Sequence, residues 1–433
     1  MRLLIRKIWP LFFCALSSVA FATDPPTPVD ASAATTLGEK KVNWWSPFFW
    51  FNPATAPFLP VPEVATDPDS GTTIGLLAVK LKTDDQGEIR RIIAPDLLYN
   101  PYFGVGGHFR IYDYPSPDRQ WSVVAGLKEK VERGVDFEYQ DGIQRDRRWS
   151  YTYSLVYDRD GTPRFYGFGN NSPAFAQTDY TAQQEYAQAQ IGYNLNHKWQ
   201  LLYTFLLRSV DVLPGTLAGI ASLQTRFGEI LGVGTNTEQL NRFAVVYDTR
   251  DNVTVPSHGM KWVVYGGLAS RRGILNDSLY DEAGMDGRAY LPLTPSAVLA
   301  GHMSLRYLPT THRLPFWALS SLGGDTSDIG GSQTLRGFGP GRFYDRDAFS
   351  ASAEVRQRVL NINAVTTNVE IELAPFVDIG RVFDRPSAIP LSRLHTVGGL
   401  GFRGIARPFV VGYVDVGYGS EGVAVFTGID YPF

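Results

Sequence analysis

One arginine in the sequence lies in a long glycine-rich stretch, where its guanidinium could bind a carboxylate. Residues 323–338 hold five glycines, a single arginine, Arg336, and no helical or strand periodicity, which predicts a long shaped loop. A guanidinium carries five donors in a fixed fork that matches a carboxylate, and flanking glycines let the backbone approach a wall closely. The stretch fits either a solvated turn with a surface arginine or a loop whose Arg336 docks on a buried acid.

The two segments that follow this loop offer acids for such docking. Residues 350–359 alternate with period two and place Glu354 on the polar face, and residues 367–383 place Asp378 on a polar face in the same way. Both carboxylates are therefore predicted to point to one interior. A loop folded back into that interior would bring Arg336 to either acid. If such a pair is buried, removing one partner typically costs about 3–5 kcal/mol.

Other signals of chemistry are weak. The six histidines are scattered singly, without metal-ligand spacing, and the G-x-G-x-x-G pattern at 399–404 is followed by no helical pattern. No Ser/His/Asp set emerges, so we expect no enzyme activity, no metal and no cofactor. The chain has 40 basic and 43 acidic residues and no basic tract, which argues against nucleic acid as a partner.

The N-terminal part reads as targeting sequence followed by a linker-like segment. Residues 1–22 combine basic residues, an apolar run and a small-residue end, as a secretory signal does; they contain Cys14, the only cysteine, so the mature chain is expected to lack thiols. Residues 23–70 are rich in proline and are predicted to hold little regular structure. Their aromatic cluster at 44–51 fits an interfacial anchor or a plug, and the anchor is favoured. Residues 71–433 are predicted to form one β-barrel.

Period-two alternation runs through most of this remaining sequence. In 199–208, for example, aromatic and aliphatic residues alternate with polar ones, and strands of this length suit a tilted bilayer crossing. We predict an all-β fold, a transmembrane antiparallel β-barrel of about 16 strands, apolar outside and polar inside. Seventeen candidate strands can be drawn, and because such barrels usually have an even number, one of those between 71 and 114 is expected to be wrong. Short turns would be periplasmic, and the long loops extracellular: 159–182, 211–240 and 309–346.

Several motifs resemble one known family, the bacterial surface antigen barrels of the BamA/TamA superfamily of outer-membrane assembly and translocation proteins. The resemblance covers about residues 71–433 and is carried by Leu335-Arg336-Gly337-Phe338, Glu354-Val355-Arg356, Phe376-x-Asp378-x-Gly380 and the turn Asp248-Thr249-Arg250-Asp251. It implies that the loop is tucked into the lumen with Arg336 held by Asp378 and Glu354. It also implies a seam between the first and last strands. The sequence leaves no room for the periplasmic POTRA domains of many family members, which puts an assembly role in doubt.

The last residues resemble the terminal signal by which outer-membrane barrels are recognised, with Tyr431 and Phe433 expected on the lipid face of a closing strand. Two hypotheses remain open. One is an integral barrel of the bacterial outer membrane that assists protein or lipid insertion or translocation. The other is a passive or gated pore for small solutes, plugged by the 320–343 loop. The expected partners are outer-membrane lipid, the assembly machinery during biogenesis, and a protein client or an accessory periplasmic partner.

Overall fold

The computed structural model of the protein describes a chain that is almost entirely strand. It covers residues 59–67, 71–84, 89–272, 276–311, 314–364, 367–384, 393–406, 410–429 and 431–433. The predicted signal at 1–22 and the aromatic cluster at 44–51 lie outside these described residues. In the described part of the chain, no helix is long and apolar enough to cross a bilayer.

The elements follow one another along the chain with few interruptions. The strands that form the main wall are β1 Leu59–Asp67, β2 Gly71–Thr83, β3 Ile89–Ile93, β4 Asp96–Asn100, β5 Gly104–Ser116, β6 Arg119–Lys128, β7 Arg133–Asp141, β8 Trp149–Asp160, β10 Thr178–Asn194, β11 Trp199–Pro214, β13 Gly234–Asp248, β14 Gly259–Arg272, β15 Asn276–Thr294, β16 Ala297–Tyr307, β20 Asp347–Ala364, β21 Thr367–Phe383, β22 His395–Ala406, β23 Val410–Gly419 and β24 Gly422–Ile429. The loops contain β9 Arg164–Phe165, β12 Ala221–Ser222, β17 Ser320–Leu322, β18 Ser332–Gln333, β19 Phe343–Asp345, the helix α2 Leu223–Phe227 and the 3-10 turns η2 Ala174–Ala176 and η3 Phe316–Ala318.

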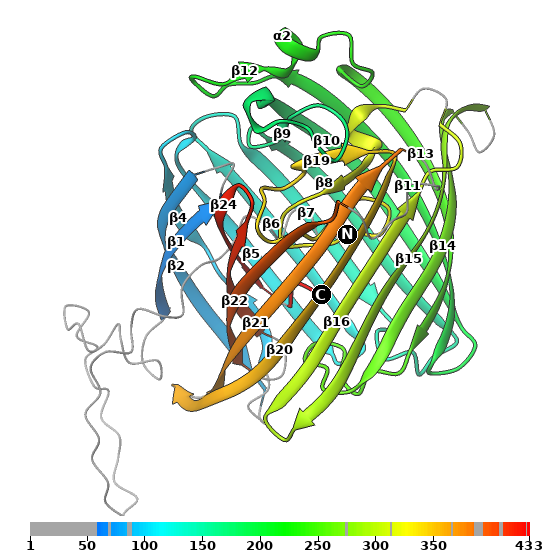
Figure 1. Ribbon diagram of the computed structural model, residues 1–433. Coiled ribbons are helices and arrows are strands. Elements are labelled where there is room, and N and C mark those ends of the chain that lie inside the picture. The colour runs from blue at the N-terminus through cyan, green and yellow to red at the C-terminus, as the bar shows by residue number, and fades with distance from the viewer. Residues whose placement is uncertain are drawn as a thin grey trace, which may run out of the picture.

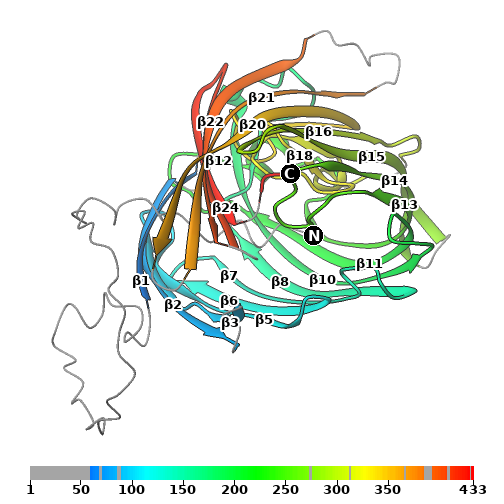
Figure 2. The ribbon, with the colours of Figure 1, turned by 90° about the horizontal axis from the view of Figure 1, so that it is seen from below.

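Neighbouring strands of the wall pair antiparallel from β1 to β24, and the wall curves round a lumen (Figures 1 and 2). The sheet has 21 strands. The strands β9 and β12 have two residues each, and β3 and β4 share one position between β2 and β5, which leaves eighteen positions in the wall. The all-β antiparallel prediction is confirmed, and the count of about 16 is too low.

The first strand explains the miscount. All three predicted strands between 71 and 114 exist, as β2, the β3–β4 position and β5, so the expectation that one of them was wrong is itself wrong. The unpredicted strand is β1, which lies inside the proline-rich segment assigned to 23–70. Its ladder with β2 runs unbroken through Pro60 and Pro62. Because proline has no N–H, both residues sit where that group would point away from β2.

The wall has an apolar outer face and a polar inner face, as predicted. A soluble protein has the opposite arrangement. Outward-facing residues are large and apolar: Phe243 is 67% exposed and Leu155 is 56% exposed. Inward-facing residues are polar and buried, as Ser350, Ser352 and Glu354 are on β20. An apolar exterior of this kind fits lipid, and a polar interior needs internal partners for its charges.

The three longest connections lie at one end of the wall, as predicted, although the short connections 129–132 and 420–421 lie there too. One end of the wall, the short-turn end, carries the connections 117–118, 142–148, 195–198, 249–258 and 295–296. The other, the long-loop end, carries 161–177, 215–233 and 308–346, because β10, β11 and β13 extend further than the sequence pattern indicated. Of these loops, Figure 1 shows 215–233, with β12 and α2, above the wall. Their apolar side chains pack together around Phe165, Leu223 and Phe316, so the long-loop end is capped.

Candidate functional site

The long connection between β16 and β20 folds into the lumen as a small three-stranded sheet. Within it β17 pairs parallel with β18 and antiparallel with β19, and an isolated bridge joins Gly324 to Leu335. The side chains of Gln333, Thr334 and Arg336 are fully buried. The loop is therefore a packed element of the interior.

Arg336 uses its guanidinium fork as the sequence chemistry predicted. Its Nε and Nη2 donate to the two carboxylate oxygens of Asp378 at 2.9 and 2.7 Å, and its backbone N–H donates to the same group at 3.0 Å. Its Nη1 donates to Glu354 at 2.9 Å and to Asp415 at 3.0 Å. The structure thus brings Arg336 to both predicted acids, and it adds a third that the sequence reasoning missed.

The three acids belong to a larger charged cluster that spans four wall strands. Arg356 donates to Glu354 at 2.7 Å. Arg403 contacts Glu354 at 3.4 Å and pairs closely with Asp415. Every side chain in the cluster is 2% exposed or less. Three arginines and three carboxylates therefore neutralise one another where water is largely excluded, and for this reason each of them depends on its partners.

The charge of Arg336 itself is strongly favoured in this setting. Burial alone lowers the pKa of a guanidinium, but the carboxylates of Asp378, Asp415 and Glu354 raise the pKa of Arg336 well above its ordinary value. The cation also lies 3.5 Å from the centroid of the Phe376 ring, which adds a cation–π contact. Arg336 is consequently always positively charged, and its guanidinium contacts three carboxylates and the Phe376 ring.

Small residues let the loop backbone press against the wall. A Cβ on Gly337 would lie 2.6 Å from Val397 Cγ2 and 2.8 Å from the backbone nitrogen of Gly419. A Cβ on Gly380 would lie 2.8 Å from Leu322 of β17. Phe338 packs in the buried apolar cluster of the loop and wall. All the residues predicted to hold the loop, Arg336, Gly337, Phe338, Glu354, Phe376, Asp378 and Gly380, therefore lie at this one contact.

A second arginine fastens the far side of the loop. Arg342 donates through Nη2 to Glu421 at 2.6 Å and to the backbone oxygen of Ser172 at 2.8 Å. Its guanidinium also lies 4.2 Å from the centroid of the Tyr166 ring. This anchor joins the loop to the long connection 161–177 and to the β23–β24 turn. No period-two pattern marks it, because none of its contacts lies within a long strand.

The C-terminal residues do not lie where the sequence indicated. The strand β24 ends at Ile429, and Tyr431 and Phe433 are 6% and 2% exposed. Arg356 donates to the Phe433 carbonyl at 3.0 Å and lies 3.6 Å from the Tyr431 ring centroid. The Phe433 ring stacks on His302 at 5.3 Å. The expectation of a lipid-facing pair is wrong: the tail turns into the lumen, where Arg356 offers both a donor and a cation.

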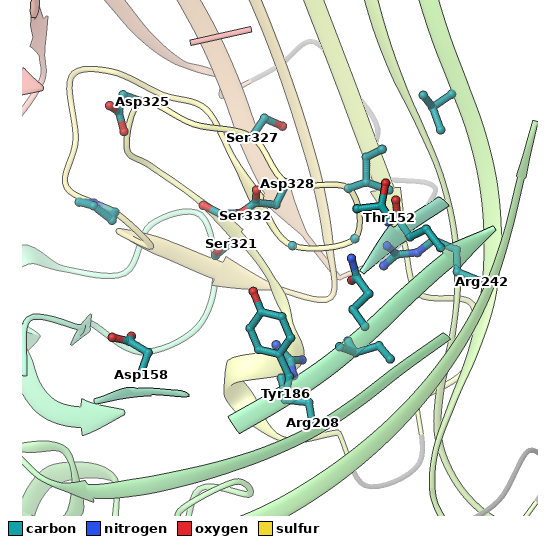
Figure 3. Close-up of a pocket in the computed structure, with 18 of the residues that line it drawn as sticks. Thr152, Asp158, Tyr186, Arg208, Arg242, Ser321, Asp325, Ser327, Asp328 and Ser332 are labelled. Carbon is teal, nitrogen blue, oxygen red and sulfur yellow. The ribbon is translucent and has the colours of Figure 1, made fainter. Parts of the chain in front are cut away.

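A polar cavity of about 1120 Å³ remains between the loop and the facing wall. Figure 3 shows Asp325, Ser327 and Asp328 of the loop on one side and Tyr186, Arg208 and Arg242 of the wall on the other. Arg208 pairs with Glu238 at 2.5 Å, and Arg242 pairs with Glu282 at 2.6 Å. The cavity lining extends from Pro163 and Arg164, in a connection of the long-loop end, to the turns at 142–148 and 249–258 of the short-turn end. The cavity therefore runs along the lumen.

Comparisons with known proteins give one family match and several structural neighbours. A sequence model of the Omp85 superfamily domain matches residues 120–402. Among solved structures, BamA from Haemophilus ducreyi lacking POTRA domains 1-3 is 14% identical, with 82% of this chain and 74% of that chain covered and a TM-score of 0.48. CdiB from Escherichia coli is 11% identical (86% and 61% covered, TM-score 0.44), and CdiB from Acinetobacter baumannii is 14% identical (82% and 65% covered, TM-score 0.44).

The chain therefore spans less than two thirds of either CdiB chain. No curated protein matches the sequence significantly. The domain match, in contrast, extends over well over half of the sequence and includes Arg336, Glu354 and Asp378. The chain belongs to the Omp85 superfamily, the superfamily of outer-membrane insertion and translocation barrels.

Proposed function

We propose that this protein assists the insertion or translocation of proteins or lipids at the bacterial outer membrane, and that it does so at the seam between β1 and β24. The observation that carries the proposal is the character of this seam. The strands β1 and β24 lie next to each other, yet no hydrogen-bonded register joins them among the described residues. The other neighbouring positions in the wall are joined by ladders.

The sequence of β1 supplies a reason for the weak seam. Pro60 and Pro62 lack N–H groups on the edge that faces away from β2. Two ladder hydrogen bonds toward β24 are therefore ruled out chemically. An edge with free carbonyls and few donors is open to pairing with an incoming strand or to entry of lipid. The capped loop end and the fastened loop 320–345 would keep the lumen closed while the seam opens.

Restoring the missing donors tests this proposal. In the double variant Pro60→Val/Pro62→Val, two new hydrogen bonds at about 1 kcal/mol each would lower the open-seam population by roughly 30-fold. We expect slower folding of an unfolded outer-membrane barrel into liposomes that contain the variant. The matched control is Pro292→Val in β15, away from the seam, which should leave the rate unchanged. Equal folding rates with the wild type and with the double variant would show that the seam has no part in the mechanism.

A gated pore is the second candidate, and the polar lumen cavity favours it. In that function the loop 320–343 would act as the plug. Planar-bilayer recordings separate the two functions. Steady, large openings of the wild type would support the pore. A silent wild type that conducts only after Arg336→Ala would support a lumen that is kept closed.

The remaining parts of the proposal concern biogenesis. Residues 1–22 would direct export and be removed, and the segment up to residue 70 would contribute β1 and an interfacial anchor at 44–51. Tyr431 and Phe433 would be read as an assembly signal in the unfolded chain, before they enter the lumen. A periplasmic partner would supply client recognition. Mass determination of the membrane-extracted protein tests the cleavage at residue 22.

A further inference from the structure

Two like charges oppose each other inside the lumen near the short-turn end. Lys261 on β14 is the direct cross-strand partner of Arg288 on β15, and both residues line the cavity. Like charges directly opposite on neighbouring strands destabilise a sheet. On the other side of Lys261 the register partner is Asp248. A wall that needed only stability would not place these cations together.

Two further cations approach the same place from the turns. Arg250 donates from Nε and Nη2 to Asp248 at 3.0 and 2.8 Å. Arg145, in the turn 142–148, reaches the same carboxylate at 3.5 Å. Lys261 lines the same cavity as Arg145, Asp248, Arg250 and Arg288. One carboxylate is thus shared by several cations.

The acids near these cations have other partners as well. Asp248 serves two arginines, and Asp286 lies 3.4 Å from Arg288 and 2.7 Å from His302. Asp251 also lines the cavity, but its oxygens accept hydrogen bonds from Ser257 and His258. Asp248 is therefore shared by Arg250 and Arg145, and in the part of the chain that the structure describes Lys261 has no carboxylate of its own.

Donors in this cluster lack acceptors. Among the described residues, Lys261 has neither a hydrogen bond nor an ion pair to its amine. Arg145 Nη1 is buried and has no hydrogen-bond partner. Burial and Arg250 lower the pKa of Arg145, and Asp248 offsets this only in part. An oxyanion bound in this cavity would offer acceptors to these donors.

The backbone of Arg145 indicates that its position is imposed. Its φ is 60°, in the left-handed region that non-glycine residues rarely adopt. Strain of this kind costs about 1–3 kcal/mol and clusters at functional sites. Here it directs a guanidinium into the cavity, although a glycine in the same turn would be unstrained.

We propose that Lys261, Arg145, Arg250 and Arg288 form a binding site for a phosphate group at the short-turn mouth of the lumen. Phosphate suits the site because guanidinium forks and a lysine amine are its common protein ligands. A phosphate monoester carries about −1.5 to −2 charges at neutral pH, which matches an excess of cations better than a single carboxylate does. The phosphate arrives either on a soluble periplasmic molecule or on a lipid headgroup.

Calorimetric titration of the purified full chain in nonionic detergent tests the site. The two probes are inorganic pyrophosphate and dihexanoyl phosphatidic acid below its micelle concentration. We expect saturable binding to the wild type, weakened about tenfold in Lys261→Gln, since one charge-assisted contact is lost. Tighter binding of the lipid identifies a headgroup site, and equal or tighter binding of pyrophosphate identifies a soluble ligand.

Lys128→Gln is the matched control, because Lys128 lines the same cavity but is already paired with Glu132 at 2.5 Å. Its affinity for the probes should equal that of the wild type. Ligand-free Lys261→Gln should resist heat at least as well as the wild type at low salt, because a repulsion is removed. No saturable binding to the wild type, equal weakening in Lys128→Gln, or a less heat-resistant Lys261→Gln would each overturn the proposal.

Discussion

Replacing Arg336 by methionine should destabilise the barrel because Asp378 then loses the partner of its charge. Asp378 receives three hydrogen bonds, all from Arg336, whereas Glu354 keeps Arg356 and Asp415 keeps Arg403. Since Asp378 is fully buried, Arg336→Met leaves one uncompensated charge, at a cost of about 3–5 kcal/mol. The measurement is the free energy of unfolding in urea, supported by the temperature at which the folded band disappears on a gel.

The reasoning is tested most sharply by removing both partners. Arg336→Met/Asp378→Asn deletes the charge that the single variant strands, so it should recover a large part of the lost stability. Arg147→Met is the control, because Arg147 is about half exposed and its ion pairs with Asp118 and Asp141 lie at the surface; it should cost about 0–1 kcal/mol. A double variant as unstable as the single one, or a single variant as stable as the control, would refute this account.

Three further outcomes follow from the geometry. Gly337→Ala should cost about 1–3 kcal/mol, because its Cβ would meet wall atoms at 2.6 and 2.8 Å, whereas Gly398→Ala, with nothing within 4 Å, should be neutral in the same urea titration. Phe433→Ala should lower the heat resistance of the assembled barrel; a slower folding rate with unchanged heat resistance would contradict a structural role in the lumen. Burial raises the pKa of Asp251, but hydrogen bonds led by that from the Ser257 hydroxyl lower it overall. The turn 249–258 should therefore become protease-sensitive as pH falls below about 4, and the Asp251→Asn variant should lose this pH dependence.

Local alternation was sufficient to predict that Glu354 and Asp378, two of the three acids that contact Arg336, point into the lumen. In β20 and β21 the side-chain direction has period two, so the parity of Glu354 and Asp378 follows from their own strands. The face of the strand on which a residue lies can be predicted without knowing which strands are neighbours. The contact with Arg336 then required only that the loop enter the lumen, which the glycines and the family resemblance both indicated.

The parts that were missed depend on distant chain segments. Asp415 reaches Arg336, and Arg403 reaches Glu354, because β22 and β23 continue the same wall, and no local pattern reveals that register. The strand β1 was missed because Pro60 and Pro62 usually exclude strand structure, an objection that does not hold at an edge. The C-terminal tail was misplaced because the period-two pattern was extended beyond Ile429, where β24 stops.

One row of inward-facing residues links the proposed phosphate site to the fastened loop. Successive register partners across the wall are Asp248, Lys261, Arg288, His302, Ser352 and Asp378. At one end of this row the cations outnumber the acids. At the other end Asp378 accepts three hydrogen bonds from Arg336. Because His302 lies between the two ends and stacks on Phe433, a phosphate at Lys261 would act on the residues that hold the C-terminal tail. The tail follows β24, the last strand of the proposed seam, so this row of residues would link occupancy of the mouth to pairing at the seam.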